Sequence, residues 1–163
     1  MIEELTPDAL PHMMALQQDC LDLKDPFTPT SAQGYERCYR FQNFCLGVWS
    51  ARREQLIAFL CCTMPTARAA RNLGRGRVPD ALLDSVGHMN TLLVRAGHRG
   101  QGLGKRLMRQ GIEQLRARGA VQIYAVASPE NAASLHMLRS LGFDEIERME
   151  LDGVPKLLLA LTD

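Results

Sequence analysis

Four glycines lie within a span of eight residues, directly before a lysine, in a chain of 163 residues; they are Gly97, Gly100, Gly102 and Gly104. The apolar segment before them, residues 88–94, is typical of a buried strand. Residues 103–116 after them place their apolar side chains on one helical face. Glycines allow close approach of the backbone, and the first amides of a helix lack partners within the helix. This strand–turn–helix pattern predicts an anion-binding site.

Two common phosphate-binding loops do not fit this segment. A P-loop requires Gly-Lys-Ser/Thr, but Gly104-Lys105 is followed by Arg106. The dinucleotide motif Gly-x-Gly-x-x-Gly requires one residue more than the spacing of 100, 102 and 104. What remains is Arg99-Gly-Gln-Gly-Leu-Gly104, of the form Arg/Gln-x-x-Gly-x-Gly/Ala. This resembles the pyrophosphate loop of the GNAT superfamily of N-acetyltransferases, which bind acetyl-coenzyme A (acetyl-CoA).

A second segment resembles the same family. Residues 131–143 read Asn-Ala-Ala-Ser-Leu-His-Met-Leu-Arg-Ser-Leu-Gly-Phe. They are similar to the second GNAT signature, Asn-x-x-Ser/Ala followed by a helix that ends in Leu-Gly-Phe. The motif follows Arg99 in the order and region in which the family carries it. Taken alone, Asn131 is also typical of a helix cap or a turn.

The resemblance implies an α/β fold of mixed α+β type, the acyl-CoA N-acyltransferase fold. Its central sheet is mostly antiparallel with one parallel, splayed pair of strands, and helices cover both faces. Periodicity predicts a compatible order: N-terminal helices, a hairpin of 44–50 and 56–63, a strand–helix–strand unit over 88–127, a helix from about 131 to 141, and a hairpin of 143–151 and 154–161. Residues 65–84 read as a long loop rich in arginine, and the length predicts a single domain, 1–163.

The resemblance also implies which residues hold the cosubstrate. Pantetheine would pair with the main chain at the end of the strand, and the amides of the glycine turn would take the pyrophosphate. The expected cofactor-binding residues are Leu92, Leu93, Val94, Arg99, Gly100, Gln101, Gly102, Leu103, Gly104, Lys105 and Asn131.

Acetyl transfer to an amine requires a base, because an alkyl ammonium is mostly protonated at neutral pH. Many family members carry a glutamate six residues before the strand valine, and here that position is His88. An imidazole suits proton abstraction near neutral pH, so His88 is the candidate general base. The alternative is a histidine that only bonds a neighbour at the start of the strand. The family's usual acid, a tyrosine seven residues after the asparagine, is replaced by Leu138. Tyr124 and His136 could take the place of this acid; the alternative is that both are ordinary packing or surface residues.

The composition restricts partners and location. A formal net charge of +1 gives no general attraction to nucleic acid, and no apolar run is long enough to span a membrane. The acidic N-terminus lacks the apolar core of a signal peptide, so reduced cysteines and a cytoplasmic location are expected. The spacing of the five cysteines and four histidines predicts no metal site.

These observations predict an acyltransferase that moves acetyl from acetyl-CoA to a primary amine of a small molecule or a protein, by direct attack in a ternary complex. The alternatives are a non-catalytic CoA-binding sensor or scaffold, and a nucleic-acid-binding protein that uses the loop 68–77. The acceptor is expected to enter between the N-terminal helices and the last hairpin, where Glu147, Glu150 and Asp152 would attract a cationic amine. The oligomeric state, monomer or homodimer, stays open.

Overall fold

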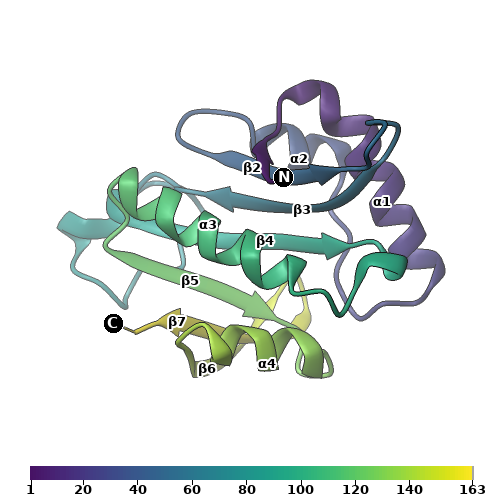
Figure 1. Ribbon diagram of the computed structural model, residues 1–163. Helices are drawn as coiled ribbons and strands as arrows, with labels where there is room; N and C mark the ends of the chain where they lie inside the picture. The colour runs from purple at the N-terminus through teal and green to yellow at the C-terminus, as the bar shows by residue number, and fades with distance from the viewer. Residues whose placement is uncertain (163) are drawn as a thin grey trace.

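The computed structural model describes residues 1–162, whose strands form one sheet in the order β1-β2-β3-β4-β5-β7-β6 (Figure 1). The strands are β1 (Glu3–Glu4), β2 (Phe44–Trp49), β3 (Leu56–Thr63), β4 (Val86–Val94), β5 (Gln122–Ala127), β6 (Phe143–Leu151) and β7 (Val154–Leu161). Neighbouring strands are antiparallel except β4 and β5, which are parallel. The expected mixed sheet with one parallel pair is confirmed.

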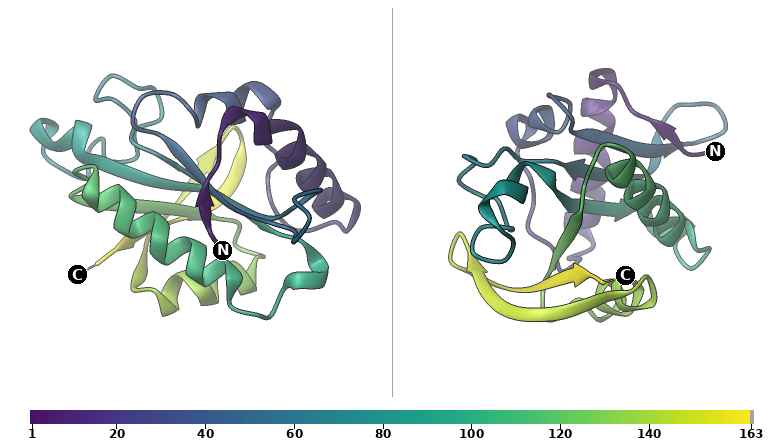
Figure 2. Two further views of the ribbon diagram at one scale, coloured as in Figure 1. Left: turned by 45° about the horizontal axis from the view of Figure 1, so that its top comes forward. Right: turned by 90° about the vertical axis from the view of Figure 1, so that its left-hand side faces the viewer.

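Helices cover both faces of the sheet (Figures 1 and 2). On one face, α1 (Leu10–Asp22) and α2 (Ala32–Arg37) pack on β2, β3 and the second half of β4. On the other face, α3 (Leu103–Ala117) and α4 (Ala132–Ser140) enclose the larger core cluster. Gly111 allows α3 to pack closely on the sheet, because a Cβ atom at this position would lie only 2.7 Å from Cδ2 of Leu60.

Local signals in the sequence explain most of the element boundaries. Ser31 caps α2, accepting a hydrogen bond of 3.0 Å from the amide of Gly34. Gly119 follows the end of α3 with a φ of +99°, a conformation that residues with a side chain rarely adopt. Asp152 and Gly153, both at positive φ, form the predicted tight turn between β6 and β7. The two-residue strand β1 was not expected from the sequence.

Residues 66–84 cover part of β4, β5 and β7 on the face of the sheet that also carries α1 and α2. Leu73 and Val78 from this loop pack with Val86, Tyr124 and Leu158 in a third core cluster that also includes Ala160. The loop contains no α-helix, and its second half forms a 3₁₀ turn, Asp80–Ser85. An ordered loop of this length indicates that it has a specific structural or functional role.

The apolar last strand is buried within the chain itself. β7 lies between β5 and β6, and Leu157 to Ala160 are all buried. The apolar character of this strand therefore needs no partner subunit to explain it. In the part of the chain from 1 to 162, every helix is too short or too polar to cross a bilayer.

Candidate functional site

The parallel strands β4 and β5 separate toward their carboxyl ends. Their ladder pairs Val86 with Gln122 and ends at Met89 with Ala125, although β4 continues to Val94. Figure 1 shows the two arrows diverging beyond this point. The main chain of β4 from residue 90 onward therefore has no pairing with β5, and it is available to a ligand that lies along it.

An irregularity in β4 marks the same place. Cys61 pairs with Thr91, but the next residue of β3, Cys62, pairs with Met89, so Asn90 is an extra residue. Such a bulge reverses the alternation of side chains after it. As a result, Met89 contributes to the core under α3, whereas Leu93 packs toward α1. Asn90 itself is exposed and donates to Oγ1 of Thr63 at 2.9 Å.

The glycine turn lies between the end of β4 and the start of α3. Gly100 and Gly102 have φ values of +77° and +75°, and a Cβ atom at either position would meet no atom within 4 Å. The first helical hydrogen bond runs from the amide of Arg106 to the carbonyl of Gly102. Among the described residues, the amides of 100 to 105 form no backbone hydrogen bond. The turn thus presents open space beside unpaired donors at a helix N-terminus.

Gly104 brings this turn close to both flanking elements. A Cβ atom there would lie 3.3 Å from Cδ2 of Leu92 and 3.5 Å from Sδ of Met137 in α4. The turn, the end of β4 and α4 are therefore neighbours. Three segments that the sequence predicted to share one site, around 92–94, 99–105 and the helix after Asn131, do meet at this edge of the sheet.

Arg99 has partners that the sequence did not reveal. Its guanidinium donates to both carboxylate oxygens of Asp25 and, through Nε, to the carbonyl of Val94 at 2.9 Å. The ion pair is partly exposed, with 41% of the Arg99 side chain accessible. Arg99 thus joins the glycine turn to the segment after α1, and its remaining exposed surface faces solvent near the turn.

If the glycine turn takes the pyrophosphate, Arg99→Ala should weaken acetyl-CoA binding by about ten- to a hundredfold, because a charge-assisted hydrogen bond to phosphate typically contributes about 1.5–3 kcal/mol. Isothermal titration with acetyl-CoA measures the effect. Asp25→Asn is the matched control, since it removes the ion pair but leaves the guanidinium in place, and its affinity should stay within about threefold of the wild type. An equal loss in both variants would show that the pair acts only by holding the turn.

Asn131 and Leu138 occupy structural positions on α4. The side chain of Asn131 caps the helix by accepting a hydrogen bond of 3.1 Å from the amide of Ser134. Leu138 is 3% exposed and belongs to the main core cluster. The position at which the family carries its usual acid therefore faces the core here. His136 is exposed on the same helix.

His88 is buried on the α1–α2 side of β4, beside Tyr124 of β5, which is its partner in the parallel register. Its Nε2 accepts a hydrogen bond of 3.1 Å from the amide of Leu73. Burial, together with the positive charge of Arg71, lowers the pKa of His88 to about 4. The ring is consequently neutral, with its proton on Nδ1 and its lone pair directed at the loop.

The hydroxyl of Tyr124, whose pKa is raised by burial, makes no hydrogen bond within the described residues.

Three of the four arginines of the 66–84 loop hold the loop in place. Arg71 and Arg77 form ion pairs with Asp152 and Glu147 of the last hairpin. Arg75 donates to the carbonyls of residues 67 and 69 within the loop. These contacts give Arg71, Arg75 and Arg77 a structural role within the chain.

The buried amide of Asn72 organises the same loop. Nδ2 donates to the carbonyls of Thr66 and Leu83, and Oδ1 accepts from the amide of Gly74 at 2.9 Å. Sequence reasoning missed Asn72, because an isolated asparagine in a loop carries no distinctive spacing. Together with His88 it fixes the loop over the first residues of β4.

Residues 10–143 match the model of the acetyltransferase (GNAT) family, and they include both motifs and the diverging strands β4 and β5. The chain belongs to the GNAT acetyltransferase family. It is accordingly an acyltransferase enzyme, and its parted strands and glycine turn correspond to the elements that the resemblance assigned to acetyl-CoA.

One curated relative and several solved structures resemble this GNAT enzyme. Streptothricin acetyltransferase from Streptomyces lavendulae is 40% identical over 50 residues, 31% of this chain and 26% of the relative. The chain thus matches only about a quarter of that relative's length. The ribosomal-protein-S18-alanine N-acetyltransferase from Escherichia coli aligns over 99% of this chain and 92% of its own, with 18% identity and a TM-score of 0.73.

A third similar protein was solved with the cosubstrate. NAA60 from Arabidopsis thaliana, in complex with acetyl-CoA, aligns over 98% of this chain and 96% of its own, with 14% identity and a TM-score of 0.74. At these identities the structural likeness shows the fold alone. Together with the family match, it supports acetyl-CoA as the cosubstrate and acetyl transfer as the reaction.

Proposed function

We propose that this enzyme transfers the acetyl group of acetyl-CoA to a primary amine, of a small molecule or a protein, by direct attack in a ternary complex. The observation that carries the proposal is the separation of β4 from β5 directly beside the open glycine turn. An extended pantetheine chain needs main-chain hydrogen-bond partners, which the unpaired part of β4 supplies. The pyrophosphate needs hydrogen-bond donors, which the amides of the adjacent glycine turn supply.

In this proposal the cosubstrate lies along the second half of β4. The main chain at Leu92, Leu93 and Val94 pairs with pantetheine. The pyrophosphate lies on the turn formed by Arg99, Gly100, Gln101, Gly102, Leu103, Gly104 and Lys105. Asn131 contributes by starting α4 next to the turn, since its own side chain already caps that helix.

The chemistry needs few side chains. The acceptor nitrogen attacks the thioester carbon, a main-chain amide near Val94 stabilises the developing oxyanion, and the CoA thiolate leaves readily because a thiol pKa is about 8.5. Direct attack is supported by the cysteines, all five of which are buried as free thiols. Reduced cysteines also favour a cytoplasmic location in this proposal. The enzyme acts as one domain, 1–163, either as a monomer or as a homodimer.

His88 remains the candidate general base, under one condition. Its Nε2 lone pair accepts the amide of Leu73, and a pKa of about 4 leaves little driving force for proton abstraction at neutral pH. Base catalysis by His88 therefore requires the 66–84 loop to move away from the ring when the acceptor binds. That movement would expose the imidazole and return its pKa toward the usual range.

The acceptor is proposed to bind between the N-terminal helices and the last hairpin. Glu147 and Asp152, two of the three acids expected to attract a cationic amine, are paired with Arg77 and Arg71. Glu150 has no such partner among the described residues and is exposed. The similar proteins include acetyltransferases named for streptothricin and for a ribosomal-protein alanine. These names are consistent with an acceptor amine on a small molecule or on a protein.

The test is turnover with a broad panel of primary amines, from small cationic compounds to peptides with free N-termini. We expect release of the CoA thiol above the hydrolytic background with at least one amine, and an acetyl mass increment on that amine by mass spectrometry. Binding of acetyl-CoA without thiol release across the whole panel would instead favour a CoA sensor. Thiol release accompanied only by acylation of oxygen acceptors would overturn the choice of an amine.

A further inference from the structure

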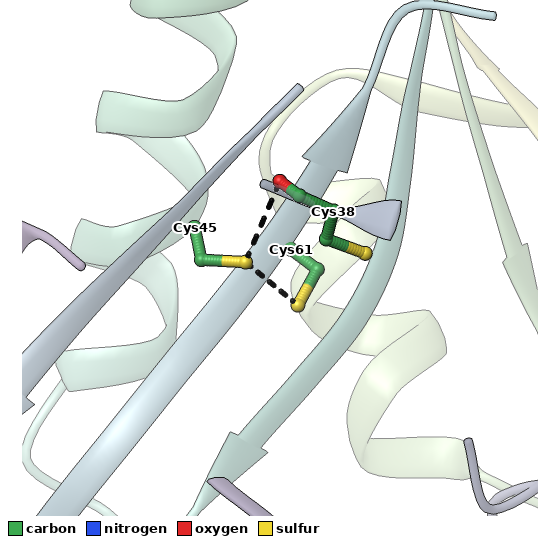
Figure 3. Close-up of side chains that lie close together, drawn as sticks. All are labelled: Cys38, Cys45 and Cys61. Atoms are coloured by element: carbon green, nitrogen blue, oxygen red, sulfur yellow. Dashed lines mark hydrogen bonds between the residues drawn. The ribbon is translucent and has the colours of Figure 1, made fainter. Parts of the chain in front are cut away.

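Three cysteines that are distant in the sequence converge beneath α2. Cys38 follows the last residue of α2, Cys45 lies in β2 and Cys61 lies in β3. Their three Sγ atoms all lie within 4.8 Å of one another (Figure 3). All three are buried, with exposures of 7%, 0% and 0%. We call this group the cysteine triad.

The strand pairing brings the first two sulfurs together. Cys45 and Cys61 are directly opposite in the antiparallel ladder of β2 and β3, so both side chains point to the same face of the sheet. Their Sγ atoms are 3.2 Å apart. The C-terminal end of α2 places Cys38 above them, where its thiol donates to the carbonyl of Gly34 at 3.5 Å.

The donor set of the cysteine triad is purely sulfur. Among residues 1–162, no histidine or carboxylate joins the group. Thiolates select soft ions such as copper(I) and zinc or iron–sulfur clusters over magnesium and calcium. Structural zinc is almost always four-coordinate, and iron–sulfur clusters are held by four cysteines. We propose that Cys38, Cys45 and Cys61 form a three-sulfur site for a soft monovalent cation, copper(I).

Cysteine binds a metal ion as the thiolate, so copper(I) has to displace the protons of the three thiols. Binding forms three copper–sulfur bonds, breaks three S–H bonds and releases three protons to solvent. The triad lies in an apolar cluster that includes Tyr35 and Phe59, so the three sulfur atoms are the ligands that the site offers. Because these ligands must lose protons, the affinity for copper(I) should rise with pH.

An ion can reach the triad through the end of α2. This helix has only six residues, and the turn after it contains Phe41, which is 94% exposed at a φ of +55°. Short, exposed segments of this kind open locally with little free energy. Once bound, the ion would tie α2 to β2 and β3, so it should stabilise the folded state in proportion to its affinity.

The test is anaerobic titration of the reduced full-length protein with copper(I) in competition with a chromophoric copper(I) chelator. We expect one tightly bound ion per chain, release of three protons, and a rise in Tm at one equivalent. Cys38→Ser and Cys61→Ser should each weaken binding at least about a hundredfold, because each removes one of three ligands. Cys62→Ser is the matched control, and its affinity should remain within about threefold of the wild type.

Cys62 suits this purpose because it is adjacent to Cys61 and equally buried, but it points to the opposite face, near Sδ of Met89 at 3.8 Å. Cys38→Ser keeps the test decisive if a strand variant fails to fold, since Cys38 lies at the end of a short helix. X-ray absorption at the copper edge should show three sulfur neighbours. A wild-type affinity no tighter than that of Cys38→Ser, an equal loss in Cys62→Ser, or oxygen ligands on copper would each overturn the proposal.

Discussion

Gly102→Asp is expected to abolish measurable acetyl-CoA binding, with a loss of at least about a hundredfold, or about 2.7 kcal/mol. Gly102 precedes α3 at a φ of +75°, with no atom within 4 Å of where a Cβ would lie. A carboxylate in this space would lie among the free amides that the pyrophosphate is proposed to use. It would compete for those donors and repel the phosphates.

Gly76→Asp is the control that separates charge at the turn from backbone strain. Gly76 has nearly the same φ, +76°, and equally open surroundings, but it lies in the 66–84 loop. Both variants should lose about 1 kcal/mol of folding stability from the left-handed conformation. Only Gly102→Asp should lose acetyl-CoA in isothermal titration. Retained binding in Gly102→Asp would remove the glycine turn from the cosubstrate site.

The second large effect is a pH dependence of folding stability that originates in His88. The folded-state pKa is about 4, below the ordinary value of 6.5. Between these values the unfolded chain binds a proton that the folded chain does not, so the free energy of unfolding falls as the pH falls through this window. The contribution of His88 to this loss is about 2 kcal/mol between pH 7 and pH 5. Urea unfolding at several pH values measures it.

Two substitutions distinguish the roles of His88. His88→Gln retains an acceptor for the amide of Leu73 but does not titrate, so it should flatten the pH dependence while largely preserving stability at pH 7. His88→Ala leaves that amide without its partner and should lower stability at every pH, by about 1–3 kcal/mol. An unchanged pH dependence in His88→Gln would contradict the assignment of the neutral, buried ring.

The same variants test catalysis. If His88 is the general base, both should lower kcat while leaving the affinity for acetyl-CoA unchanged, and the acidic limb of the pH profile of kcat should disappear. If the ring only positions the 66–84 loop, His88→Gln should keep most of kcat. An unaltered kcat and pH profile in both variants would remove His88 from the mechanism.

Most of the fold follows from local patterns. Periodicity and caps predicted α1 to α4 and six of the seven strands, because each long element buries one face and ends at glycine, serine or proline. β1 was missed because its two residues, Glu3 and Glu4, are polar and gain their strand conformation only by pairing with β2. Long-range pairing of so short a segment leaves no local signal.

The proximity of the glycine turn and the end of β4, which form most of the proposed cosubstrate site, was predictable because these residues are nearly contiguous. The glycine turn and the end of β4 are joined by peptide bonds, so their proximity is fixed by the chain. The partners of these residues were not predictable: Asp25 is 74 residues from Arg99. Likewise, the role of the arginines at 71 and 77 became apparent only where the last hairpin approaches the loop.

The sequence alone determined the GNAT family, the order of the longer elements and the position of the glycine turn that is proposed to bind the pyrophosphate, since these depend on spacing along one chain. Only the tertiary structure decided what His88 contacts and that Cys38, Cys45 and Cys61 meet. A histidine's pKa depends on burial and on neighbours from other segments. The convergence of the three cysteines depends on the register of β2 with β3 and on the docking of α2. Such contacts arise from packing between distant segments, and no spacing along the chain encodes them.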